Sequence, residues 1–362
     1  METEAFAKKR VLLFVQGEGR GHLMQVVGLS ESLTKSKFEI CAIVVGKPKK
    51  KTIPSFFREN FSCEIKEMTS PGFISNKNNK GINLRASVIN SILHVPTYAR
   101  NLREIKKIID NHNPDLILNF FEPLISLYFL FYKKRIPFYC IGHQYIYLHN
   151  KFTFPKGQII NRFVIKNYTR LTCVRANKIF ALSFYTLTKQ NNLIVVPPIV
   201  RKEIKNQDSK NENFILVYLS NYGFLKELVE WHNKNSTVLI HCFTDNQKFD
   251  FNYQSENFFV HPINDKEFAK KLANCNSLCS TAGFESVCEA MYLGKPVMMI
   301  PMHKHFEQYC NARDAFFAGA GIYDAKFNLS KLISFTNTYT KNSLFKIWVD
   351  NNEDQILNEL LN

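Results

Sequence analysis

The stretch that decides the fold runs from residue 280 to residue 312 and reads STAGFESVCEAMYLGKPVMMIPMHKHFEQYCNA. Its order is small-residue turn, helix, strand, loop, helix, which is typical of parallel strands covered by helices. The turn leaves the first N–H groups of a helix free, and unpaired donors together with the helix dipole favour an anion such as a phosphate. We therefore expect the turn and the helix start to bind a phosphate group through Thr281, Ala282, Gly283 and Phe284.

Three side chains downstream extend this predicted site beyond the phosphates. Glu289 comes six residues after Gly283, nearly two helical turns on, where a carboxylate can accept hydrogen bonds from both hydroxyls of a ribose. Glu307 and Gln308 follow the next predicted strand, within reach of a sugar beyond a diphosphate. An ordinary α/β unit with a capped helix is the alternative, but acidic and amide groups recur at both strand ends and favour a nucleotide-sugar site.

A second motif lies near the N-terminus. A buried-strand run over 11–15 leads into Gly17-Glu18-Gly19-Arg20-Gly21-His22, after which apolar residues recur at helical spacing. Glycines let the backbone turn tightly and approach a ligand, so Gly19 and Gly21 are expected to contact the donor. The third glycine comes one residue earlier than in a dinucleotide-binding fingerprint, and a histidine follows it. His22 is the predicted general base for a hydroxyl acceptor, because histidine takes a proton near neutral pH; helix capping or packing is its alternative role.

Together the two motifs resemble the GT-B glycosyltransferases, and within them the branch of the peptidoglycan N-acetylglucosaminyltransferase and the UDP-glucuronosyltransferase-like bacterial proteins. The resemblance extends over most of the chain, through 113–117, 121–123, 136–144 and 196–201 as well as the two motifs. It implies an α/β protein of two Rossmann-like, doubly wound domains facing a cleft. It also implies that the C-terminal domain holds the nucleotide sugar and that neither a cofactor nor a metal ion is required.

The resemblance assigns roles to three further residues. Glu122 would orient His22 or bind the acceptor; members of this branch often carry an aspartate just before this position, where this chain has Asn119-Phe120-Phe121. Ser220, in the turn after a predicted strand, would help to stabilise the departing diphosphate. Ile263 would meet the nucleotide base through its backbone.

The alternation of strands and helices sets the expected domain boundaries. Residues 1–197 form the acceptor-binding domain and residues 198–340 the nucleotide-sugar-binding domain, because Pro197-Pro198 interrupts helices and strands alike. The segment 341–362 holds a last helix that, by resemblance, packs back on the N-terminal domain. Arg201 lies just after the hinge and is interpreted as a surface arginine rather than as a ligand of the diphosphate.

The composition agrees with this organisation. The 362 residues, 45% of them apolar, suffice for two domains with cores of their own. Lys and Arg outnumber Asp and Glu by 47 to 31, and a net charge of +16 implies an anionic partner or surface unless the excess is solvated lysine. No nucleic-acid-binding signature is present, so nucleic acid is not an expected partner. Nine scattered cysteines and the lack of a signal-peptide pattern predict a reduced, cytoplasmic protein.

We therefore expect a glycosyltransferase of the hexosyltransferase type that inverts configuration and needs no metal ion. Its donor is a nucleoside-diphosphate sugar, with UDP favoured by the ribose partner and by the resemblance, and its acceptor is a hydroxyl group. Two alternatives stay open. A non-hydrolysing nucleotide-sugar epimerase shares the fold but needs further acidic catalytic residues. A non-catalytic nucleotide-sugar-binding protein is disfavoured by the intact His22, Glu289 and Gln308.

The N-terminal domain also suggests what kind of molecule accepts the sugar. The domain combines the loop 70–83, a basic helical region at 85–107, three basic residues at 133–135 beside an apolar helix, and an aromatic-rich stretch at 145–154. Such a mixture suits an anionic membrane surface, where each Lys or Arg contributes about 1 kcal/mol. We therefore expect a lipid-linked acceptor, reached from the cytoplasmic face by a peripheral protein. The alternative is that these aromatics are core residues and the lysines a solvated face.

Overall fold

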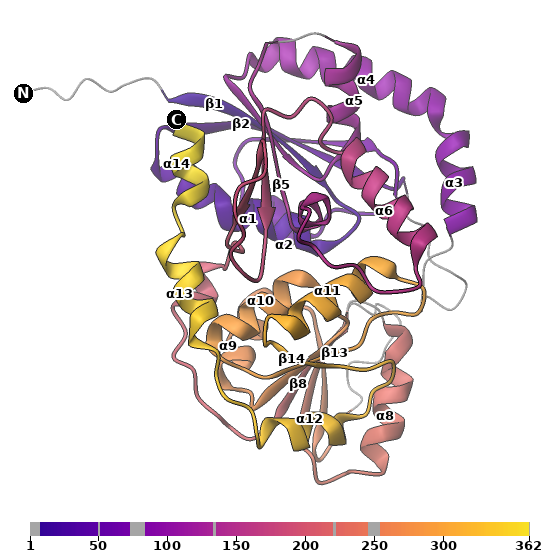
Figure 1. The fold of residues 1–362 in the computed structure, drawn as a ribbon, viewed down its shortest axis with the longest axis vertical. Coiled ribbons are helices and arrows are strands. Elements are labelled where there is room, and N and C mark those ends of the chain that lie inside the picture. Colours follow the sequence, from indigo (N-terminus) through magenta and orange to yellow (C-terminus); the bar gives the residue numbers. More distant parts are fainter. Residues whose placement is uncertain are drawn as a thin grey trace, which may run out of the picture. The chain divides into compact units, whose positions relative to one another are not determined.

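The computed structural model describes residues 8–49, 51–72, 84–132, 135–219, 222–244 and 254–361. The chain divides into two compact units, shown in Figure 1. The first contains the described residues up to Ile199 together with the C-terminal segment from Asn352, and the second contains Val200–Asn351. The division at residues 199 and 200 lies two residues beyond the predicted boundary.

The first unit is built on a parallel sheet of seven strands in the order β3-β2-β1-β4-β5-β6-β7. β1 and β4 are neighbours, and the strand order runs outward from this pair in opposite directions. Loops after such a pair diverge, which makes the carboxyl ends of β1 and β4 the place where this fold binds ligands. The strands are β1 (Lys9–Gln16), β2 (Phe38–Lys47), β3 (Glu64–Thr69), β4 (Leu116–Phe120), β5 (Phe138–Gly142), β6 (Lys178–Leu182) and β7 (Leu193–Val196).

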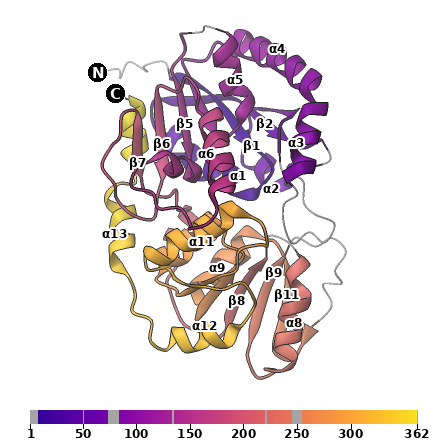
Figure 2. The same ribbon diagram turned by 45° about the vertical axis from the view of Figure 1, so that its right-hand side comes forward.

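Helices cover both faces of this sheet. Right-handed crossovers put α1 and α2 on one face and α4, α5 and α6 on the other. The contacts between helices agree with this assignment, since α1 contacts α2, and α5 contacts both α4 and α6. Figure 2 shows α5 and α6 together in front of the sheet. The bounds are α1 (Arg20–Lys35), α2 (Ser55–Glu59), α3 (Leu84–Leu93), α4 (Val95–His112), α5 (Pro123–Phe131), the 3₁₀ helix η1 (His143–Leu148), α6 (Ile159–Leu171) and α14 (Gln355–Leu361).

The second unit repeats the plan with the strand order β10-β11-β9-β8-β12-β13-β14. All of its pairs are parallel except β10 with β11, and the strand order reverses at β8 and β12. Its strands are β8 (Ile215–Leu219), β9 (Ile240–Thr244), β10 (Gln254–Ser255), β11 (Phe258–Pro262), β12 (Ser277–Ser280), β13 (Val297–Met299) and β14 (Gly321–Tyr323). Its helices are α7 (Lys202–Lys205), η2 (Tyr222–Phe224), α8 (Leu225–Asn233), α9 (Asp265–Asn274), α10 (Phe284–Leu293), α11 (Phe306–Phe317), α12 (Leu329–Thr336) and α13 (Ser343–Asn351).

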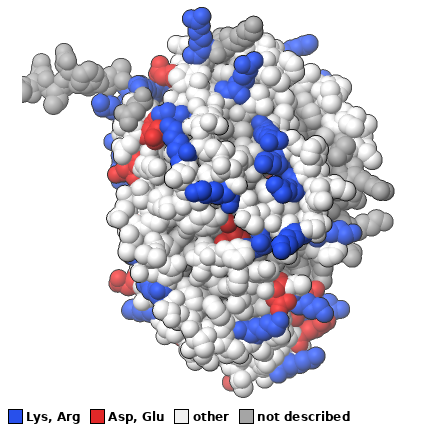
Figure 3. Space-filling model, in the orientation of Figure 1, with Lys and Arg blue, Asp and Glu red and all other residues white. Residues whose placement is uncertain are grey.

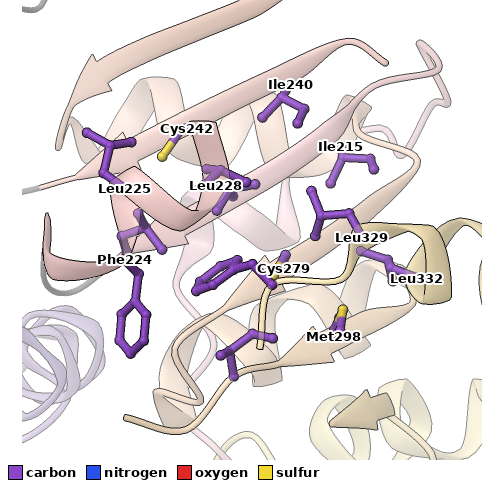
Figure 4. Packing of buried hydrophobic residues seen from close by; sticks show 14 of the residues in the cluster. Ile215, Phe224, Leu225, Leu228, Ile240, Cys242, Cys279, Met298, Leu329 and Leu332 are labelled. Atoms are coloured by element: carbon purple, nitrogen blue, oxygen red, sulfur yellow. The ribbon is translucent and has the colours of Figure 1, made fainter. Parts of the chain in front are cut away.

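Apolar side chains on one face of the second sheet form a core with α8 and α12 (Figure 4). Leu225 and Leu228 come from α8, Leu329 and Leu332 from α12, and the strands contribute residues such as Met298. Each fully buried side chain of this kind contributes roughly 1.5–3 kcal/mol. The opposite face of the sheet is left for α9 and α10, and the start of α10 forms part of the candidate donor site.

Pro96 predicts an interruption of the helical region that runs up to His112, and the structure confirms it. α3 and α4 break at His94 and place Pro96 in the first turn of α4, where its missing N–H needs no partner. Another local prediction changes. The single helix predicted over 341–361 is α13 and α14, separated by the turn-favouring Asn352-Glu353-Asp354. α14 belongs to the first unit, where Glu359 pairs with Lys178 at 2.9 Å. The predicted loop 70–83 and Lys133-Lys134 lie largely outside the described residues.

No helix in the described part of the chain combines the length and the hydropathy that crossing a bilayer requires.

Candidate active site

The N-terminal motif lies where β1 passes into α1. A Cβ on Gly17 would come within 2.6 Å of the Val45 side chain, so this position needs glycine. Gly19 is the N-cap of α1 in an extended conformation, and no described side chain caps the helix. Gly21 and His22 lie in the first helical turn, beside backbone N–H groups that have no partner within the helix. Donor contact at Gly19 and Gly21 stays a prediction.

His22 is surrounded by residues from the ends of three strands. It lies in α1 with 8% of its surface exposed, and its ring stacks on Phe121, which follows β4, at a centroid distance of 5.4 Å. His22 Nδ1 lies 3.3 Å from Oε1 of Gln25, one turn further along α1. His22 Nε2 lies 3.3 Å from Nε2 of Gln144, which follows β5 in η1. The carboxyl ends of β1, β4 and β5 therefore converge on this imidazole.

The two amides select one tautomer of His22. The oxygen of Gln25 can only accept, so Nδ1 carries the proton and donates it; the amide nitrogen of Gln144 donates to the lone pair on Nε2. Burial lowers the pKa of His22 to about 4, an effect that the hydrogen bond to Gln25 partly offsets. The ring is therefore neutral at pH 7. A substrate hydroxyl that took the place of the Gln144 amide would meet a proton acceptor.

We expect Gln25→Glu to move the acidic limb of the pH–rate profile to higher pH. A base works only when deprotonated, so the parent rate should hold down to about pH 4, the pKa of His22. A carboxylate next to Nδ1 favours the imidazolium and raises that pKa by roughly 1–3 units. Gln25→Met, which adds no charge, is the matched control and should keep the limb low. NMR titration of the His22 ring in both variants measures the same shift without turnover, and an unmoved titration in Gln25→Glu would contradict the pairing.

Glu122 does not orient His22, and this prediction is wrong. It is the N-cap of α5: one carboxylate oxygen accepts from the backbone N–H of Ile125 at 3.1 Å, and the other accepts from Ser70. Burial raises the pKa of Glu122 to about 7, although these hydrogen bonds oppose the shift. With none of its surface exposed, Glu122 is also closed to an acceptor in this structure. Its local role is to begin α5 and so to fix Phe121 beneath His22.

Backbone strain marks the turns after three strands. Phe121 after β4, Ala282 after β12 and Lys304 after β13 have φ angles of +65°, +56° and +61°. Residues with a Cβ rarely adopt this left-handed region, which costs of order 1–3 kcal/mol each and is common at ligand-binding turns. Phe121 contacts the predicted base, and Ala282 lies in the predicted phosphate turn. The strain therefore coincides with the predicted site in each unit.

The donor motif has the predicted local structure. β12 ends at Ser280, and the turn leads into α10, whose N-cap is Gly283 without a described side-chain cap. Asn311 of α11 holds the turn from behind, donating from Nδ2 to the carbonyl of Ala282 at 3.4 Å. Thr281 is buried, so it can contribute only through the backbone that it positions. The first N–H groups of α10, beginning at Phe284, point out of this turn and fit a phosphate; phosphate binding itself stays a prediction.

Glu289 is not an open carboxylate, because a buried arginine already holds it. Arg201 donates from Nε to Oε1 at 2.5 Å and from Nη2 to Oε2 at 2.9 Å, and both side chains are more than nine-tenths buried. The carboxylate of Asp265 lies 3.9 Å from the same guanidinium. The interpretation of Arg201 as a surface residue is therefore wrong. Each Glu289 oxygen keeps a further lone pair, so ribose binding stays a prediction that now depends on Arg201 for the orientation of the carboxylate.

Gln308 and Glu307 begin α11, after the loop that follows β13. The Gln308 Oε1 accepts from the backbone N–H of Met302 at 2.8 Å, and His305 caps the helix by accepting from the Gln308 N–H at 3.3 Å. Burial lowers the pKa of His305 to about 4. The backbone N–H and the side-chain Oε1 of Gln308 thus both hold the loop in place. Its amide nitrogen has no partner among the described residues and can donate to a sugar hydroxyl. Glu307 is half-buried beside it.

Two predicted donor residues add less. Ser220 lies outside the described residues. Ile263 directly follows β11 and is half-buried, while the neighbouring His261 and Pro262 are part of that strand. The structure neither adds to nor removes their predicted contacts. The residues that sequence reasoning missed are Gln25, Gln144 and Arg201. Only Gln25 carried a local signal, since i and i+3 share one face of a helix.

The model for glycosyl transferase family 1 matches residues 9–338. MurG from Acinetobacter baumannii is 13% identical with a TM-score of 0.51, and the alignment covers 98% of this chain and 91% of MurG. LpCGTa in complex with UDP is 14% identical with a TM-score of 0.57, and the alignment covers 97% and 95%. Spinosyn rhamnosyltransferase SpnG complexed with thymidine diphosphate is 13% identical with a TM-score of 0.58, and the alignment covers 96% of each chain.

No curated protein sequence matches the chain. The solved structures share the two-unit α/β architecture and so identify the fold. The family match spans most of the chain and includes both motifs. The chain therefore belongs to glycosyl transferase family 1, and it is a glycosyltransferase with the GT-B fold.

Proposed function

We propose that the protein is an inverting, metal-independent glycosyltransferase that moves a sugar from a nucleoside-diphosphate sugar, UDP-linked, to a hydroxyl acceptor. The observation that carries the proposal is the state of His22. It is neutral, its Nδ1 proton is held by Gln25, and its Nε2 lone pair is directed at a group that a hydroxyl can replace. This is the arrangement that a general base for a hydroxyl requires.

The proposed reaction is a single displacement. His22 Nε2 takes the proton of the acceptor hydroxyl while its oxygen forms a bond to the anomeric carbon of the sugar. The bond from that carbon to the diphosphate oxygen breaks, and the electron pair leaves with the nucleoside diphosphate. Attack opposite to the leaving group inverts the anomeric configuration.

The second unit supplies the groups for the leaving diphosphate. The uncapped N-terminus of α10 offers N–H donors and a positive dipole end to the diphosphate. Glu289, oriented by Arg201, would accept from the ribose diol, and Gln308 would donate to the sugar. Among the described residues there is no group of three His, Cys, Asp or Glu side chains placed to hold a metal ion, so backbone donors take this role in the proposal. Two solved structures of this fold are described with UDP and with thymidine diphosphate, which makes both bases candidates for the test below.

We further propose an amphiphilic, lipid-linked acceptor at the cytoplasmic face of a membrane. Helices α3 and α4, in the basic helical region 85–107, expose four apolar side chains, Ile89, Ile92, Leu93 and Val95. All nine cysteines are free thiols, as a reducing compartment favours. One expected contribution is wrong: the aromatic residues over 145–154 form a buried cluster and cannot face a lipid.

The test of the proposed function is the binding of nucleoside diphosphates by the intact protein, with and without excess chelator. We expect UDP to raise the unfolding temperature more than thymidine diphosphate does. At a concentration 100 times its dissociation constant, a ligand adds about 2.7 kcal/mol of stability. The chelator should leave the shift unchanged, and the product of a UDP-sugar reaction should have the opposite anomeric configuration to the donor by NMR. A preference for thymidine diphosphate would replace the proposed donor, and a shift that disappears with chelator would contradict the metal-independent mechanism.

A further inference from the structure

The excess positive charge of the chain is concentrated in one segment. Residues 123–199, all in the first unit, contain no Asp or Glu and eleven Lys or Arg, so they account for 11 of the 16 net positive charges. The rest of the chain holds 36 basic and 31 acidic residues and is much closer to balance. A general solvated surface would mix both signs, so this segregation indicates an anionic partner for the part of the first unit that runs from α5 to β7.

α6, in the middle of this segment, exposes apolar side chains. Ile159, Ile160 and Phe163 are 81%, 77% and 70% exposed, and Thr169 is the only buried residue among the thirteen of the helix. A surface helix of a globular domain normally turns its apolar side chains inward, because burying each of them contributes 1.5–3 kcal/mol or so. Here they are turned outward, so a partner that accepts apolar groups is required to explain them.

Basic side chains lie along the same side of α6. Arg162, Lys166 and Arg170 follow one another at intervals of four residues, and at 100° per residue they fall with the three apolar side chains within roughly half of the helix circumference. None of the three pairs with a described carboxylate. Burial lowers the pKa of Lys166, and the charges of Arg170 and Arg162 lower it further. Like charges four residues apart weaken a helix unless an anion neutralises them. Figure 3 shows Lys and Arg side chains grouped over α6.

The inner side of α6 connects this surface to the candidate base. Tyr168 packs edge-on against Phe121 with ring centroids 5.7 Å apart, and Phe121 stacks on His22. The Tyr168 hydroxyl also accepts from Gln16 Nε2 at the end of β1, at 3.4 Å. The outer side of α6 is therefore connected to the imidazole through the helix and the rings of Tyr168 and Phe121.

We infer that α6 docks the protein on an anionic lipid surface, with Ile159, Ile160 and Phe163 inserted among the lipids and Arg162, Lys166 and Arg170 at the headgroup phosphates. An interfacial helix combines these two kinds of residue on its exposed side. A nucleic acid would neutralise the basic residues and leave the apolar ones in water, so lipid explains both sets. The inference rests on the proposed function in one respect, which is that a docked protein would receive a lipid-linked acceptor near His22.

The experiment is sedimentation of the full chain with phosphatidylcholine vesicles that contain or lack phosphatidylglycerol. Donor and acceptor are left out, so the result does not depend on catalysis. We expect binding only to the anionic vesicles and its loss at high salt, because the Debye length falls from about 10 Å at 0.1 M to about 3 Å at 1 M. Exchange of Arg162, Lys166 and Arg170 for Gln should weaken partitioning on the order of 100-fold, since each lost charge costs about fivefold.

Matched variants separate docking at α6 from general effects of charge and hydrophobicity. A control variant exchanges three exposed lysines of the second unit for Gln, namely Lys226, Lys234 and Lys266. It removes the same net charge, but its effect on partitioning should be at least tenfold smaller than that of the α6 variant. Ile159→Ser with Ile160→Ser should weaken binding, whereas Leu344→Ser with Ile347→Ser, at exposed apolar positions of α13, should not.

Three results would overturn the proposal. They are equal binding to neutral and anionic vesicles, equal partitioning of the α6 variants and their controls, and binding of an oligonucleotide through α6 without any vesicle binding. The UDP-induced stabilisation of each variant is measured alongside. If the parent is stabilised by UDP but does not bind vesicles, the docking inference is wrong and the proposed function stands. If the parent binds anionic vesicles but is not stabilised by UDP, the proposed function is wrong and the docking inference stands.

Discussion

His22→Ala is expected to lower turnover by about 10²–10⁴-fold, the usual contribution of a general base. The affinity for UDP should stay within about twofold of the parent value, because the groups predicted to bind its ribose and diphosphate lie in the second unit and the exchange leaves the backbone of Gly19 and Gly21 in place. A loss of turnover at unchanged UDP affinity is the pattern expected of a residue that acts in the transition state. Initial rates at saturating donor, with UDP affinity from calorimetry, measure the two effects separately. Near-normal turnover in the variant would remove His22 from the mechanism.

The fold of the variant needs its own control, because His22 is buried against Phe121. His22→Gln retains a hydrogen-bonding side chain of similar size and should fold like the parent while losing the same activity, since an amide is no base at neutral pH. The Gln25→Glu exchange adds a second check. In the His22→Ala background it should no longer move the acidic limb of the profile, because residues that act as a unit are not additive. A limb that still moves would place the titrating base elsewhere.

The sequence predicted the fold well where hydrophobic pattern and turn chemistry agree. The apolar pattern predicts strands at 10–16 and 38–46, and apolar runs in the buried centre of a parallel sheet are a strong signal. β1 and β2 appear within one residue of these bounds. Two of the strands that were not predicted carry a weaker signal. β3 is a polar edge strand reading Glu-Ile-Lys-Glu-Met-Thr, and β14 spans only three residues. Their pairing is decided by the neighbouring strand rather than by their own pattern.

The site was predictable where local backbone chemistry determines it and unpredictable where it depends on distant contacts. Gly283 as an uncapped helix start is a property of the turn itself, and the sequence predicted it. The partners of His22 depend on which strand ends converge, so Gln144, 122 residues further along the chain, could not be assigned. Glu122 was assigned to His22 through the resemblance, because it is the carboxylate next to the position where members of that branch often carry an aspartate. The structure shows that its geometry suits the first turn of α5 instead.

Arg201→Met is expected to destabilise the second unit by about 3–5 kcal/mol, because it leaves the carboxylate of Glu289 buried without its partner. For a domain of this size, that corresponds to a drop in unfolding temperature of roughly 6–20 °C. Arg201→Lys should recover only part of the loss, since an ammonium cannot make both hydrogen bonds of the guanidinium fork. Thermal unfolding followed by calorimetry gives both values.

The double variant Arg201→Met, Glu289→Met then separates stability from donor binding. Replacing a buried ion pair by apolar residues of similar volume is often neutral or stabilising, so the unfolding temperature should return close to that of the parent. UDP affinity should not return with it: loss of the charge-assisted hydrogen bonds to the ribose should still cost roughly 1.5–3 kcal/mol. A 2′-deoxyribose analogue of UDP is the matched ligand, because it lacks one of the two ribose hydroxyls. The difference in affinity between the parent and the double variant should be smaller for this analogue than for UDP. If the stable double variant binds UDP as tightly as the parent, Glu289 and Arg201 form a purely structural pair and the ribose contact lies elsewhere.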